Sequence, residues 1–191
     1  VAKGMGGSET WAYEVGTRLA NKGYDVTIYA DPEYDHDPCP GFHLVTYQRY
    51  FYDVLRREYD YFIYSRYASV DTILPHLKCH NVYVMVHDIC VVTPDHNTKQ
   101  IGLGRIKKYC YLSDWHKEYL LSLYSDIGLT DSLLHKVSNG YSEQFYKDVD
   151  LNNKENSMIW SSSLARGFED FYEYVFFPVF QKVPDFKLYV C

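Results

Sequence analysis

The chain has 191 residues and a formal net charge of −6, with 47% hydrophobic and 23% charged residues. This composition supports a packed core and excludes an intrinsically disordered chain. Without a basic block, the sequence also argues against a general nucleic-acid binder. No apolar run approaches the roughly 18 residues of a membrane span, and no signal peptide is recognisable. The length fits one domain, or one domain and part of another.

The five cysteines form an odd number and include no Cys-x-x-Cys pair, so we expect reduced thiols in a cytoplasmic protein. His76, Cys79 and His80 cluster, but a structural zinc site needs four ligands and the fourth is missing. We therefore expect no metal site. The aromatic content of 18%, with 21 tyrosines, suits half-buried strands or stacking on sugars, and composition does not separate the two.

The first predicted element is a helix opened by glycines at positions 4, 6 and 7. Apolar residues recur with helical spacing through Ala20, and Gly23 ends the helix before a β-rich run over 24–30. A glycine turn at a helix N-terminus favours anion binding, because its N–H groups are free and the helix dipole is positive there. The alternative is that the glycines only make a tight turn between strand and helix.

Two nucleotide-binding motifs can be compared with this stretch. The pattern Gly-x-Gly-x-x-Gly begins at Gly4, but its last position is Glu9, and no Gly-Lys-Ser/Thr tripeptide occurs. Asp31 stands where a ribose-binding acid would, although this means little without the third glycine. The strand that precedes such a turn in a βαβ unit is incomplete here, and we expect it to lie upstream of Val1.

The following residues alternate between predicted strands and helices, which is typical of a parallel α/β sheet. Residues 31–41 have the Pro, Asp and His content of a loop. Ser113 or Asp114 is a suitable N-cap for the helix that begins there. We expect strands over 43–47, 59–64, 81–86, 108–113 and 135–138, and helices over 49–57, 68–78 and from 114 onward.

A polar stretch over 148–156 is expected to be a linker, and the alternation then restarts. Strands are expected over 157–161 and 186–190. Arg166-Gly167 opens the helix between them, and Pro178 is expected to bend or end it early. Its inward face should carry Phe168, Phe171, Tyr172, Val175 and Val179.

His87 and Asp88 directly follow the predicted strand over 81–86. Ligands of open parallel sheets bind outside the carboxyl ends of the strands, so this pair is a candidate site. The alternative is that His87 is satisfied within the structure and that Asp88 caps the next turn.

Six motifs occur in order along the chain: 6–9 (Gly-Gly-Ser-Glu), 23–27, 87–88, 112–116, 137–140 with Phe145 after it, and 161–167 ahead of 183–188. Together they resemble the family-4 retaining glycosyltransferases of the GT-B fold. The resemblance implies an α/β protein with two Rossmann-like domains facing across a cleft. We therefore expect an acceptor-side Rossmann-like domain with a parallel sheet over 1–147, a linker over 148–156, and the beginning of a nucleotide-sugar-binding domain over 157–191.

The resemblance also implies roles for individual residues. Gly6 and Gly7 would approach the donor pyrophosphate and sugar. Arg166 would neutralise the pyrophosphate as it leaves, which a preorganised guanidinium does well; the alternative is a surface arginine placed unfavourably at a helix start. His87 would lie near the transferred sugar and the acceptor. Asn139 belongs to a turn near the hinge whose loop can approach the donor.

The chain departs from the family pattern in two places. A lysine normally follows the arginine, but residues 167–170 are Gly-Phe-Glu-Asp, so the phosphate site would depend on Arg166 alone. The family's paired glutamates belong beyond Cys191. We therefore expect the printed chain to be inactive alone and the intact protein to be active.

The function implied by the resemblance is a retaining hexosyltransferase. It would move a sugar from a UDP-, GDP- or ADP-linked donor to a glycan or other acceptor, without a cofactor or an obligatory metal. We expect it in the cytoplasm, at most peripheral to a membrane, with no nucleic-acid partner. The alternative is a non-catalytic module that kept the fold and binds a nucleotide sugar, a glycan or a protein. A dehydrogenase is disfavoured by Glu9.

Overall fold

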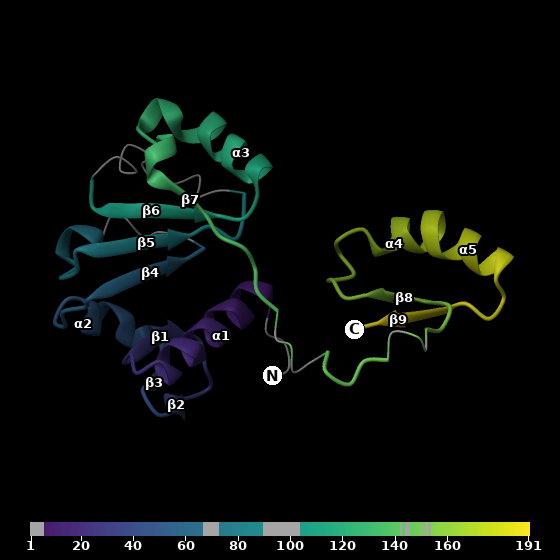
Figure 1. Cartoon of the computed structure of the whole chain (residues 1–191), viewed down its shortest axis with the longest axis horizontal. Helices are drawn as coiled ribbons and strands as arrows, with labels where there is room; N and C mark the ends of the chain where they lie inside the picture. Colours follow the sequence, from purple (N-terminus) through teal and green to yellow (C-terminus); the bar gives the residue numbers. More distant parts are fainter. Residues whose placement is uncertain are drawn as a thin grey trace. The chain divides into compact units, whose positions relative to one another are not determined.

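The computed structural model describes residues 6–66, 73–89, 104–141, 143, 146–150, 152 and 154–191. The chain divides into two compact units, Val1–Gly140 and Tyr141–Cys191, called here the first and second units. Strands and helices alternate in both, so the fold is mixed α/β as the sequence predicts (Figure 1). Among the described residues, no helix combines the length and the apolar character needed to cross a membrane.

The first unit contains a four-stranded, all-parallel sheet in the order β4-β5-β6-β7. Its strands were predicted, with bounds shifted by up to two residues. Because the strands run parallel, their carboxyl ends lie together at one edge, called here the carboxyl edge, and their amino ends at the opposite, amino edge. The strands are β4 (Tyr61–Ser65), β5 (Asn81–Met85), β6 (Ile106–Tyr111) and β7 (Leu134–Lys136).

One face of this sheet forms the core of the first unit. Val82 and Val84 of β5 are fully buried, as is Leu120 of helix α3 (Asp114–Tyr124). The helix begins where the sequence predicts, because the Ser113 hydroxyl accepts a hydrogen bond from the His116 N–H at 3.2 Å.

The helix expected over 68–78 is only partly testable, because 68–72 lie outside the described residues. The remainder is a single 3-10 turn, η2 (Leu74–His76), and the chain is already extended at Leu77. The helix prediction is therefore wrong for this part, although Ile73, Leu74 and Leu77 are buried as the apolar spacing suggested.

A second sheet in the first unit has the order β1-β3-β2. Strand β1 (Val26–Ala30) runs parallel to β3 (Phe42–Thr46), and β2 (His36–Cys39) pairs antiparallel with β3. We expected a loop over 31–41, which is wrong for β2. Its composition is unusual for a strand, but an edge strand tolerates Pro38 because one side of its backbone needs no partner. The described residues of the first unit thus form two hydrogen-bonded sheets where one parallel sheet was expected.

Helix α1 (Gly7–Asn21) packs on the second sheet through a glycine. A Cβ atom placed on Gly16 would lie 3.0 Å from the Ile28 Cδ1 atom and 3.1 Å from the Phe42 Cζ atom. Gly16 therefore allows an approach of helix to sheet that a larger residue would disturb.

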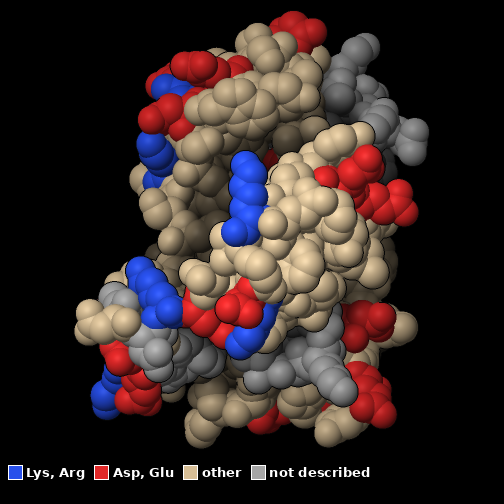
Figure 2. Space-filling view, turned by 90° about the vertical axis from the view of Figure 1, so that its right-hand side faces the viewer, with Lys and Arg blue, Asp and Glu red and all other residues tan. Residues whose placement is uncertain are grey.

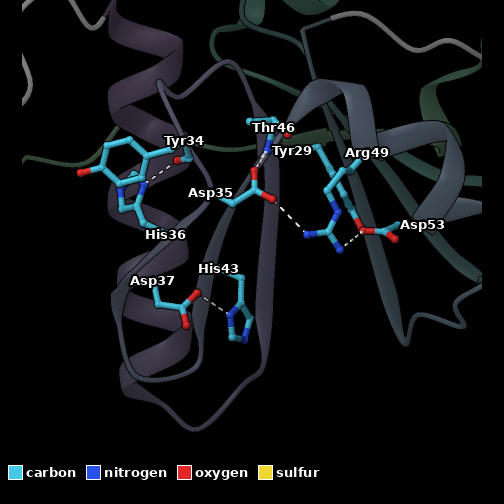
Figure 3. Close-up of polar contacts among 9 residues, drawn as sticks. All are labelled: Tyr29, Tyr34, Asp35, His36, Asp37, His43, Thr46, Arg49 and Asp53. Carbon is cyan, nitrogen blue, oxygen red and sulfur yellow. Dashed lines mark hydrogen bonds and ion pairs between the residues drawn. The ribbon is translucent and has the colours of Figure 1, made fainter.

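Polar side chains connect β1 and β3 to the turn η1 (Tyr47–Arg49) and helix α2 (Tyr50–Val54) (Figure 3). Asp35 accepts a hydrogen bond from the Thr46 N–H at 2.6 Å and lies 3.0 Å from the Arg49 guanidinium. Arg49 also lies 3.4 Å from the buried carboxylate of Asp53, which accepts a hydrogen bond from the Tyr29 hydroxyl at 3.3 Å. These contacts fix α2 against β1.

The second unit has two parallel strands, β8 (Ser157–Trp160) and β9 (Lys187–Val190), joined through a helical segment that lies along them in Figure 1. The segment is α4 (Phe168–Phe171), a π-helical turn η7 (Tyr172–Phe176), and α5 (Phe177–Lys182). The Phe177 N–H donates to the Tyr172 carbonyl, five residues back, which defines the π turn.

Two expectations about the helix can be compared with this segment. The expectation that Pro178 ends the helix early is wrong, because the proline lies in the first turn of α5 and the helix continues to Lys182. The inward face also differs, because the wider turn adds one residue to the period. Phe176 is buried, whereas Tyr172 and Val175, expected to face inward, are 45% and 43% exposed.

Candidate functional site

The N-terminus of α1 lies at the carboxyl edge, next to the ends of β4 and β5. Arg66, the residue after β4, makes the connection. Its Nε atom lies 2.8 Å from the Asp88 Oδ2 atom beyond β5, and its Nη1 atom lies 3.5 Å from the Glu9 Oε1 atom on α1. Three segments that are far apart in the sequence are thus joined by one guanidinium.

His87 lies in the same cluster and faces α1. Its ring meets Trp11 edge to face, with ring centroids 5.0 Å apart. Burial lowers the pKa of His87, while the neighbouring Asp88 carboxylate acts in the opposite direction. The imidazole is therefore neutral at pH 7. Its Nε2 atom is buried, and no described residue is its hydrogen-bond partner.

The two glycines that open α1 differ in their surroundings. A Cβ atom on Gly6 would lie 2.6 Å from the Glu9 Oε2 atom, whereas one on Gly7 would meet nothing within 4 Å. Gly6 is the N-cap residue of α1. A glycine has no side chain, so no cap hydrogen bond is made to the N–H groups of the first turn from this position. The space above the helix start is thus open at Gly7 and shared with a carboxylate at Gly6.

Glu9 supplies that carboxylate from within the first turn of α1. The pKa of Glu9 is lowered, chiefly because the carboxylate accepts a hydrogen bond from its own backbone N–H, and further because the Ser8 hydroxyl donates to it at 2.9 Å. Glu9 therefore occupies part of the region that the sequence assigns to an anionic ligand.

Arg66 is the functional candidate that sequence reasoning missed. Its φ of +77° lies in the left-handed region, which no other described non-glycine residue adopts. Such a conformation costs an L-residue roughly 1 to 2 kcal/mol. The sequence does not indicate this backbone conformation. What the sequence does offer is the position of Arg66 directly after a predicted strand of a parallel sheet.

The other predicted site residues are Asn139 and Arg166. Asn139 is exposed beyond the end of β7, and so follows a strand of the carboxyl edge. Arg166 belongs to the second unit, where it is exposed directly before Gly167, which has a φ of +85° and is the N-cap of α4. Among the described residues Arg166 has no ion-pair partner, and the first turn of α4 carries Glu169 and Asp170.

No metal centre is formed by the part of the chain that the structure describes, because no three His, Cys, Asp or Glu residues converge suitably. In the cluster 76–80, the Cys79 thiol is buried and donates to the Asn81 carbonyl at 3.6 Å. Burial raises the pKa of this thiol, which makes it a poor nucleophile.

The amino edge of the sheet also carries charged residues and a groove, lined in part by Glu58, Lys78 and Arg105. The Arg105 guanidinium donates to the carbonyls of Leu77 at 2.6 Å and Cys79 at 3.2 Å. The guanidinium thus donates hydrogen bonds to backbone carbonyls that lie outside the strands.

Comparison with known proteins gives no relative: no protein-family model, no curated protein and no solved structure matches the chain. The likeness to glycosyltransferases therefore depends on the order of its motifs. In the view of Figure 2, Lys and Arg side chains are visible on the left and in the centre, and Asp and Glu side chains are visible on both sides.

Proposed function

We propose that the protein is a retaining glycosyltransferase of the GT-B type, which moves a hexose from a nucleotide-diphosphate donor to a glycan or other acceptor. The observation that carries the proposal is the contact between helix α1, which Gly6 and Gly7 open, and His87, made by the Trp11 ring. These residues come from separate motifs of the resemblance, and contacts through Arg66 and Trp11 join their segments at one edge of a parallel sheet. Ligands of Rossmann-like domains bind at that edge.

The start of α3 supports a sugar-containing acceptor. This helix begins directly after β6, so its first turn also lies at the carboxyl edge. Trp115 is 62% exposed there and stacks on Tyr119, with ring planes 12° apart and centroids separated by 5.1 Å. A flat, rigid aromatic surface with polar neighbours suits the apolar face of a sugar ring.

In this proposal, Arg166 stabilises the leaving diphosphate from the second unit. Cleavage of the glycosidic bond to the donor leaves negative charge on the diphosphate, and a guanidinium bonds that charge strongly. His87 is neutral, so it acts as a hydrogen-bonding group toward the sugar or acceptor. No metal is required for either role.

Titration of the full-length protein with UDP-glucose, GDP-mannose and ADP-glucose, followed by thermal shift, tests donor binding. A specific donor stabilises the folded protein according to its concentration relative to Kd. Failure of all nucleotide-diphosphate sugars to bind would contradict the proposal.

We expect Arg166→Ala to reduce turnover by about 100-fold, the effect of losing one preorganised charge contact. Sugar transfer to acceptor glycans, measured at saturating donor, is the readout. Lys182→Ala, at the far end of the same helical segment, is the matched control and should keep its turnover. Equal turnover in Arg166→Ala and the native protein would remove Arg166 from the reaction.

The alternative, a binding module without catalysis, is favoured by one observation. The Glu9 carboxylate lies over the start of α1, where a donor diphosphate would be expected. Donor binding without transfer to any acceptor, and without donor hydrolysis, would support this alternative.

A further inference from the structure

The carboxyl edge holds more negative than positive charge among its connected residues. Glu9 and Asp88 are carboxylates, Arg66 is their shared cation, and His87 is neutral. Among the described residues no other cation pairs with Glu9 or Asp88, so removal of the guanidinium would leave both carboxylates without a described ion pair. An anionic donor would then approach a repulsive edge, so its binding depends on how Arg66 is held.

The backbone at Arg66 indicates that its side chain is the reason for its position. Glycine adopts a φ of +77° without strain, and an arginine does not. The Arg66 N–H is used in the sheet, donating to the Met85 carbonyl at 3.0 Å, and any residue except proline would supply that bond. Glycine would fit the backbone and supply the same N–H donor, but it has no guanidinium. We therefore attribute the arginine at this position to its side chain.

The geometry of the two ion pairs shows what the guanidinium does. The Nε atom contacts Asp88 at 2.8 Å, and the Nη1 atom reaches Glu9 at 3.5 Å from the other side. One planar group thus pairs with Asp88, the residue beside His87, and with the Glu9 carboxylate. A lysine could supply the charge but not both directions at once.

We propose that Arg66 is a positioning residue of the transfer reaction: by pairing with Glu9 and Asp88, it compensates their charge so that the donor diphosphate can approach the α1 N-terminus. This inference rests on the proposed function. It explains how an acidic helix start can serve an anionic substrate.

The first experiment measures donor affinity in variants of the full-length protein, using whichever of UDP-glucose, GDP-mannose and ADP-glucose binds the native protein. We expect Arg66→Gly to raise the donor Kd about tenfold, the scale of one partly screened charge. Adding Glu9→Gln to Arg66→Gly should restore most of the affinity, because it removes one uncompensated carboxylate. Arg56→Gln, an exposed arginine that stacks on Tyr52, is the control and should bind normally.

The restored affinity separates charge compensation from a merely structural role. A variant that had lost local structure would not regain binding when a second residue is changed. Arg66→Gly should also melt at the same temperature as the native protein or higher, because glycine relieves the backbone. The loss of affinity should shrink as salt is raised, since salt screens exposed charges. Unchanged affinity in Arg66→Gly, or no recovery in the double variant, would overturn the inference.

A second experiment follows the His87 imidazole by NMR and needs no ligand. The Arg66 charge lowers the pKa of His87, so Arg66→Gly should raise it and Arg66→Lys should not. If no donor binds the native protein, the proposed function fails, while this titration still decides whether Arg66 sets the charge of the edge. An unchanged His87 titration in Arg66→Gly would contradict the placement of Arg66.

Discussion

The two edges of the four-stranded sheet each carry an arginine, and the arginines are used differently. At the amino edge, Arg105 donates to the Leu77 and Cys79 carbonyls, which are fixed parts of the fold. At the carboxyl edge, Arg66 pairs with exposed carboxylates, and its own backbone has a strained, left-handed conformation. The same residue type completes the structure at one edge and adjusts the charge of a candidate site at the other.

The difference teaches how to separate structural from functional charge without a known relative. A structural arginine donates hydrogen bonds to backbone carbonyls that have no other donor in the fold, so its removal should lower stability. A functional arginine at an exposed edge contributes little to stability, so its removal should be seen in binding. The following experiments test this contrast.

The largest expected effect is at the amino edge. Arg105→Met should destabilise the protein by about 2 kcal/mol, because the Leu77 and Cys79 carbonyls lose a charged donor. Urea unfolding monitored by circular dichroism measures the change. Lys107→Met, at an exposed position of β6 two residues further along, is the control and should stay within about 0.5 kcal/mol of the native protein. A loss as small as the control's would remove the contrast between the edges.

At the carboxyl edge, Asp88→Asn should cost less than about 1 kcal/mol, because the side chains of Arg66 and Asp88 are 38% and 37% exposed. The same unfolding measurement applies. A cost equal to that of Arg105→Met would show that the carboxyl edge is structural as well.

His87 should make the stability of the folded protein depend on pH, and the sign of this dependence can be predicted. Its pKa in the folded state lies below the ordinary value of 6.5, so the unfolded chain binds more protons between the two values. The stability contributed by this group is therefore present above pH 6.5 and is lost as the pH falls below it. Unfolding free energies of the native protein and His87→Gln, measured between pH 5 and 8, give the difference. A contribution that increased toward acid would be contrary to a half-buried, neutral His87.

His43 should show the opposite sign and the smallest effect. Its ring lies between Asp37, at 2.8 Å from Nδ1, and Asp25, at 2.9 Å from Nε2 (Figure 3 shows the Asp37 contact). The Asp37 hydrogen bond, followed by the Asp37 charge and Asp25, raises the pKa of His43 against the effect of desolvation. Its stabilisation is full below pH 6.5 and is lost as pH rises through the folded pKa.

Because His43 is exposed, this effect should amount to a few tenths of a kcal/mol. Hydrogen exchange at β2, compared at pH 6 and pH 8, is a local and more sensitive measurement. His43→Gln should remove the pH dependence. Faster exchange at pH 6 than at pH 8, after correction for intrinsic rates, would argue against the pairing.

Much of the fold could be predicted because local sequence determines it. Val82 and Val84 belong to a short apolar run, which is typical of a buried parallel strand, and Ser113 is a recognisable N-cap. Strand β2 could not be predicted, because it contains Pro38 and polar residues and is held by pairing with β3. The π turn was missed because helical spacing was assumed to stay at 3.6 residues per turn.

The candidate site was accessible only in part. Gly6, Gly7 and His87 were singled out from the sequence, because a glycine turn and a strand end are recognisable motifs. Their roles remain proposals. Arg66 could not be identified, because a positive φ and a contact to a residue 57 positions away are three-dimensional facts.

The π turn of the second unit has a consequence for which aromatic ring fills that unit's interior. A proline ring collides with the carbonyl four residues back in a regular α-helix, and the wider turn before Pro178 avoids the collision. Replacing Pro178 with alanine would remove this obstacle and permit a uniform helix, whose register differs by about 100° per residue. Val175 would then compete with Phe176 for the buried position in the second unit. Pro178 thus determines which face of the helical segment turns inward.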